Sequence, residues 1–118
     1  MNDIKLKIEK EHYAPKENIQ VSLHWDLMDV AENIIEVHLF WYTEGRGDED
    51  MEIIETQEIK LNAKSGSKDL IFVAPLQPYS FSGKYIALTW AIEAVMQKSK
   101  ISALEIFYLT PFHEKIIL

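Results

Sequence analysis

A period-two alternation of apolar and polar side chains is the feature that most constrains how this chain can fold. It is clearest in the run from 78 to 94, Pro-Tyr-Ser-Phe-Ser-Gly-Lys-Tyr-Ile-Ala-Leu-Thr-Trp-Ala-Ile-Glu-Ala, where turn-forming residues lead into an apolar stretch. The even positions from Ile86 to Ala94 would share one face of a β-strand, with Trp90 near the middle. The run therefore predicts a strand with a buried face.

The same alternation recurs along the chain, with turns rich in Gly, Pro, Asn and Ser between the alternating segments. Short strands with turn signals every ten or so residues are typical of a sandwich. We therefore predict an all-β fold, a seven-stranded antiparallel β-sandwich, and one domain over residues 1–118. The predicted strands are 3–10, 19–27, 35–42, 51–61, 70–74, the run described above to about Gln97, and 101–109.

Two of these strands leave an alternative open. The segment Trp90–Gln97 contains residues that favour helix, but its parity matches that of the other two tryptophans, and a Lys-Ser-Lys turn follows it. We therefore predict a strand there. In the segment 51–61, Ile53 shares its parity with Glu55 and Gln57, so one side is expected to be exposed and a β-bulge would change the facing.

The aromatic residues divide into two groups by their parity. Trp25, Trp41 and Trp90 fall on the inward parity of three strands, which predicts core packing; the alternative is an aromatic platform for a sugar or a peptide. Phe40 and Tyr42 lie on the polar parity of their strand. With Tyr85 they would form an aromatic patch on the outer face, either exposed or covered by a loop or a second subunit.

Charge is unevenly distributed along this acidic chain, whose net charge is −7. Residues 1–58 hold 15 acidic and 5 basic residues, whereas residues 59–118 hold 4 and 7. Such a chain is a poor ligand for nucleic acid, which requires clustered Lys and Arg. The acidic loop Asp48-Glu49-Asp50 could bind a cation, but it lacks the spacing of a calcium loop, so a solvated hairpin tip is favoured.

Neither catalytic nor targeting motifs are found in the sequence. Cysteine, a Gly-x-Ser-x-Gly elbow and phosphate-binding glycine motifs are all absent, so we expect no enzyme, no cofactor and no metal. The first residues already alternate like a strand, and no apolar window is long enough to span a membrane. A cytoplasmic location is therefore expected.

Three short motifs, in order, resemble the arrestin-like sandwich of the immunoglobulin E-set type. They are the turn Tyr13-Ala14-Pro15-Lys16-Glu17, the segment Phe72-Val73-Ala74-Pro75, and the run Pro78–Ala94. In that family a glycine is expected where Lys16 stands, and a leucine where Ala74 stands. The chain is similar to single-domain bacterial relatives and to sporulation-control proteins of this family.

The resemblance implies a scaffold or adaptor role, in which edges and loops bind other proteins. We expect a non-enzymatic protein-interaction domain whose partner the sequence does not name. The predicted surface is formed by Phe40, Tyr42, Tyr85, Asp48, Glu49 and Asp50, and the domain could form a homodimer through the aromatic face or an unpaired strand edge. The alternative is a small-ligand or carbohydrate-binding module, cation-dependent through the acidic loop.

Overall fold

The computed structural model describes residues 3–28, 33–45, 49–83, 86–111 and 116–117. Over these residues the chain forms strands and turns without a helix. Seven of the described strands have six or more residues and three have two, so the predicted all-β fold is confirmed, with three short strands beyond the seven predicted. The strands are β1 (Asp3–Ile8), β2 (His12–Tyr13), β3 (Asn18–Asp26), β4 (Ile34–Gly45), β5 (Met51–Lys60), β6 (Ser65–Val73), β7 (Phe81–Ser82), β8 (Ile86–Met96), β9 (Ile101–Leu109) and β10 (Ile116–Ile117).

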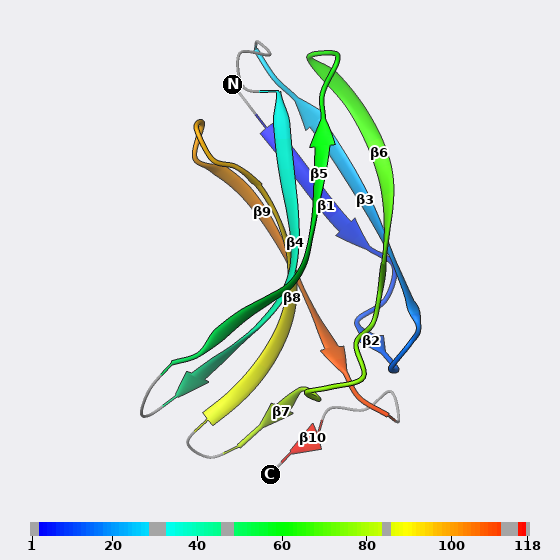
Figure 1. Cartoon of the computed structure of the whole chain (residues 1–118), viewed down its shortest axis with the longest axis vertical. Coiled ribbons are helices and arrows are strands. Elements are labelled where there is room, and N and C mark those ends of the chain that lie inside the picture. Colours follow the sequence, from blue (N-terminus) through cyan, green and yellow to red (C-terminus); the bar gives the residue numbers. More distant parts are fainter. Residues whose placement is uncertain (1–2, 29–32, 46–48, 84–85, 112–115, 118) are drawn as a thin grey trace.

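Two sheets make up the fold (Figure 1). The first has the order β1-β3-β6, and the second follows the path β10-β7-β8-β4-β5, with β9 also paired to β8. All pairs between the longer strands are antiparallel, whereas β2 pairs with β9 and β10 with β7 in parallel. Figure 1 shows that the lower halves of β4, β5 and β8 extend beyond the first sheet.

Strand β8 is the central strand of the second sheet. It pairs with β4 along one side and with β7 and then β9 along the other. Its strand geometry continues through Met96, so the prediction of a strand rather than a helix is confirmed. The physical reason is that both edges of this segment are hydrogen-bonded to neighbours, which overrides the local helix preference of Ala, Glu and Met.

The core lies between the two sheets and is built from the inward positions of the long strands. Ile19, Val21 and Leu23 of β3 are buried on one side, and Ile35, Val37 and Leu39 of β4 on the other. This alternation of buried and exposed positions is the one that the sequence pattern predicts for sandwich strands. The largest fully buried side chains are Trp90, Tyr13, Phe72 and Phe107.

The three tryptophans differ in burial, which corrects the prediction that all belong to the core. Trp90 is fully buried, whereas Trp25 and Trp41 are only partly buried and pack against the core from its margin. Trp25 lies across from Gly66 with its indole packed over that glycine, where a Cβ atom would lie 2.6 Å from the ring. Its indole N–H donates to the carbonyl of Ala63 at 3.1 Å. Trp41 lies in the second half of β4, paired with Glu52 of β5 and Trp90 of β8.

The turn before β3 accounts for one departure from the family pattern. Lys16 has a φ of 70°, a left-handed conformation that favours glycine. Its N–H donates to the carbonyl of Ala74 at 2.8 Å, and the N–H of Ala74 donates to the carbonyl of Glu17 at 2.8 Å. A lysine thus occupies the position of the expected turn glycine and keeps its backbone geometry, held by hydrogen bonds to the segment after β6.

Strands β4 and β6 extend beyond their predicted bounds. Strand β4 continues to Gly45, beyond its predicted end at Tyr42, and β6 begins at Ser65 rather than at Leu70. The polar residues Ser65–Asp69 pair with the last five residues of β3. Backbone pairing with an existing strand makes this polar segment extended, although its side chains resemble a turn.

Candidate interaction surface

The outer face of the second sheet is formed by the polar-parity residues of β4 and β8 and by the first residues of β5. A β-bulge in β5 decides which residues share this face, since Leu39 lies opposite Glu55 but Phe40 lies opposite Ile53. The extra residue, Ile54, shifts the alternation by one position. Ile53 and Met51 consequently lie on the outer face.

Apolar side chains cross the middle of this face. Phe40 lies between Ile53 on β5 and Ala91 on β8, and Ala91 in turn lies opposite Ile106 on β9. The flanking side chains are exposed, with Met51 at 61% and Ile53 at 46%, whereas the central Phe40 is only 9% exposed. The surface is therefore an apolar stripe. Its central ring, Phe40, is covered, and its aliphatic side chains, Met51 and Ile53, are exposed at the margin.

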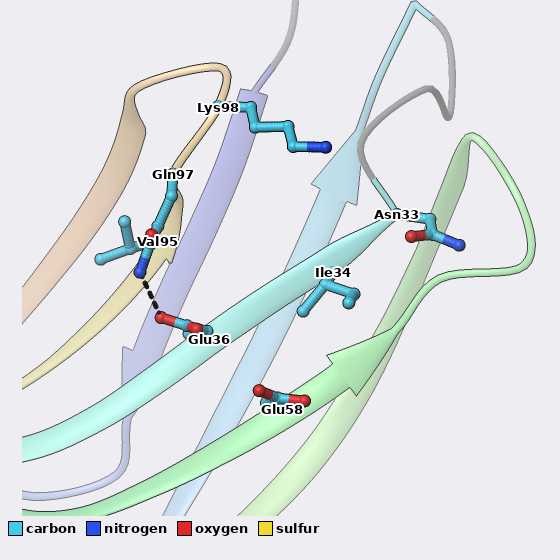
Figure 2. A pocket seen from close by; sticks show the side chains of 7 residues that line it. All are labelled: Asn33, Ile34, Glu36, Glu58, Val95, Gln97 and Lys98. Atoms are coloured by element: carbon cyan, nitrogen blue, oxygen red, sulfur yellow. Dashed lines mark hydrogen bonds between the residues drawn. The ribbon is translucent and has the colours of Figure 1, made fainter.

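Three shallow hollows follow one another along β4, and we call them together the outer groove. The first, shown in Figure 2, lies at the start of β4, where Glu36 accepts a hydrogen bond from the Gln97 side chain at 2.7 Å. The second and third share Phe40 and Met51. The outer groove is lined by Asn33, Ile34, Glu36, Glu58, Val95, Gln97 and Lys98, then by His38, Phe40, Met51, Ile53 and Glu93, and finally by Tyr42, Thr43, Glu44, Glu49 and Asp50.

Carboxylates border the outer groove at both ends. Glu36 and Glu58 lie at one end, and Glu44, Glu49 and Asp50 lie at the other. Glu93 lies beside the apolar centre, opposite His38. The imidazole of His38 lies between the two ends, with Nε2 at 3.4 Å from a carboxylate oxygen of Glu36 and Nδ1 at 2.8 Å from the hydroxyl of Thr56. The outer groove thus combines an apolar centre with acidic ends.

The sequence-predicted surface residues are brought together in part. Phe40 and Tyr42 are neighbours on the outer face, with ring centroids 5.9 Å apart. Glu49 and Asp50 line the same hollow as these two rings. Tyr85 and Asp48 lie outside the described residues.

The residues missed by sequence reasoning are Met51 and Ile53. Counted by simple alternation from Ile59, Ile53 would face the core, and only the bulge moves it to the outer face. The mixed polarity of the segment 51–61 indicates that a bulge is present, but it does not show at which residue the bulge lies.

Among the described residues that line the outer groove, Tyr42 has a raised pKa. Burial raises the pKa of its phenol above the usual 10.0, and the carboxylate of Glu44 raises it further by its charge and by a hydrogen bond. Both effects disfavour the phenolate in the folded state.

We expect the stability of the protein to fall as the pH rises above about 10, because the unfolded chain then loses the Tyr42 proton more readily than the folded one. This contribution is fully present below the unfolded pKa. Tyr42→Phe should remove it, while the similar contribution of Tyr13, whose pKa burial also raises, should remain. Urea unfolding of both proteins over an alkaline pH series measures the difference; identical pH dependence would contradict the assignment.

Among the residues that the structure describes, no group of three or more His, Asp or Glu side chains is arranged to hold a metal ion. Within the same residues, no helix has the length and apolar character needed to cross a membrane.

The two sheets form a β-sandwich, so the all-β sandwich predicted from the sequence is confirmed, and the likeness in fold to a solved structure supports the predicted arrestin-like resemblance. Among solved structures, the chain is similar to Spo0M, a sporulation control protein from Bacillus subtilis, with a TM-score of 0.60 and 16% sequence identity. The similarity covers 92% of this chain and 49% of that chain, so the chain spans about half the length of Spo0M. No protein-family model and no curated protein matches the chain.

Proposed function

We propose that this chain is a non-enzymatic protein-interaction domain that binds its partner through the outer face of the second sheet. The observation that carries the proposal is the exposed apolar margin of the outer groove, where the side chains of Met51 and Ile53 are accessible to solvent. Contiguous exposed apolar surface on a folded domain is typical of a site that a partner covers. The fold neighbour Spo0M is a sporulation control protein, which is consistent with a regulatory role.

The alternative, a small-ligand or carbohydrate-binding module, has less support. Such sites are concave and enclose most of their ligand, in cavities of roughly 300–1,000 Å³. The apolar hollow at Phe40, Met51 and Ile53 has a volume of only about 70 Å³. The hollow beside it, about 540 Å³, is within this range but is bordered by carboxylates and open to solvent, so it would not enclose a ligand. A broad macromolecular contact fits this shape better than a bound sugar.

Affinity capture from an extract of the source organism tests the proposal. The wild-type domain and the double variant Met51→Ser with Ile53→Ser are immobilised in parallel, after circular dichroism has shown that both are folded. We expect at least one protein to be enriched by the wild type and to be lost from the variant. Identical sets of captured proteins would contradict the proposed surface, and the absence of any captured protein would contradict the proposed function.

A further inference from the structure

We infer that the outer groove binds an extended segment of a partner protein that has apolar side chains at its centre and lysine or arginine toward both ends. This inference rests on the proposed function and specifies the chemistry of the partner. It follows from the order of side chains along β4, from the length of that strand and from the sign of the surrounding charges.

The dimensions of the outer groove suit a short peptide segment. Its polar-parity positions run from Glu36 to Glu44 on β4. At a rise of about 3.3 Å per residue this is roughly 26 Å, the length of an extended segment of about nine residues. A segment of this length would place its middle over Phe40 and its ends beside the carboxylates.

The apolar centre offers specific contacts to such a segment. Met51 is unbranched and adaptable, and the exposed side of Ile53 lies next to it on β5. A partner side chain placed between them would bury both against Phe40. Such small central clusters supply most of the affinity in protein interfaces.

The charges that border the outer groove favour a partner segment of positive charge. Six carboxylates border the outer groove, against one lysine, Lys98, and the imidazole of His38. A second copy docked face to face would bring these carboxylates together, which is unfavourable because like charges repel across an interface. Lysine or arginine at both ends of the segment would instead complement them.

Selection from a random peptide library tests this inference on the full chain. The library displays peptides of about twelve residues, enough to span the outer groove in extended form. We expect the selected peptides to combine central apolar residues with flanking lysine or arginine. Their binding should weaken as salt is raised, because salt screens the exposed charges.

Three variants locate the binding site of the selected peptides. Glu44→Gln with Glu49→Gln and Asp50→Asn removes charge, and Met51→Ser with Ile53→Ser removes the apolar margin; each should weaken binding roughly tenfold or more. The matched control is Ile71→Ser with Val73→Ser, which alters an equally exposed apolar pair on β6 of the first sheet and should leave binding unchanged.

Several results would overturn the inference. Selected peptides that are acidic or uncharged would do so, as would undiminished binding to both groove variants. Concentration-dependent self-association that Met51→Ser with Ile53→Ser abolishes would identify a second copy as the occupant. In these cases the domain still binds a protein, so an interaction function stands, although undiminished binding to both groove variants would also contradict the proposed surface. If neither peptides nor captured proteins bind, both proposals fail.

Discussion

Replacement of Trp90 by alanine is expected to lower the free energy of unfolding by about 4 kcal/mol. The indole is fully buried at the centre of β8, with its ring centroid 6.0 Å from that of Phe107 in a stacked arrangement. Its N–H also donates to the carbonyl of Pro78 at 2.7 Å, which ties the turn before β7 to the central strand. Alanine would leave a large cavity and an unpaired carbonyl. Urea unfolding followed by far-ultraviolet circular dichroism measures the change.

Two further variants separate the causes. Trp90→Phe keeps a ring next to Phe107 but removes the donor to Pro78, so it should lose less than the alanine variant. Trp25→Ala removes a partly exposed ring and should cost no more than about half as much, since less surface is buried there. Equal losses for Trp25→Ala and Trp90→Ala would contradict the central position of Trp90.

Ser80→Ala is expected to destabilise the fold by about 1–3 kcal/mol, although it deletes a single oxygen atom. The serine is 1% exposed, and its hydroxyl accepts a hydrogen bond from the N–H of Leu109 at 2.9 Å. The N–H of Ser80 donates in return to the carbonyl of Leu109 at 2.8 Å. Alanine would leave the N–H of Leu109 buried and unpaired, which urea unfolding would detect.

Thr110→Val is the matched control for this prediction. Thr110 is also fully buried, but among the described residues its hydroxyl has no hydrogen-bond partner. Replacing that hydroxyl by a methyl group should leave stability unchanged or raise it by up to about 1 kcal/mol, since no bond is lost. A loss in Thr110→Val as large as that in Ser80→Ala would mean that volume, rather than the hydrogen bond, matters at this end of β9.

Most of the fold could be predicted because apolar residues occupy every second position of the long strands, and these positions form the inward faces. The alternation locates β3 and β9 to within one residue of their observed bounds. It was insufficient for β6, where the polar residues Ser65–Asp69 are extended only because β3 is paired beside them. The turn at Pro15 was likewise readable, but the left-handed Lys16 depends on its bond to Ala74.

The candidate surface was predictable only in part. The polar parity of Phe40 and Tyr42 correctly places both residues on the outer face. The sequence also indicates an acidic hairpin, and Glu49 and Asp50 border the hollow beside these rings. It does not indicate that Phe40 is covered, because the aliphatic neighbours that cover it come from another strand.

By itself, the sequence determined that this chain is a β-sandwich organised around the strand after Pro78, with Trp90 inside, because period-two burial is a local property of each strand. Tertiary structure alone decided how deeply each tryptophan is buried and which residues form the outer groove. These depend on how far one sheet extends past the other and on the position of one bulge in β5. Both are properties of strand pairing, and no single segment encodes them.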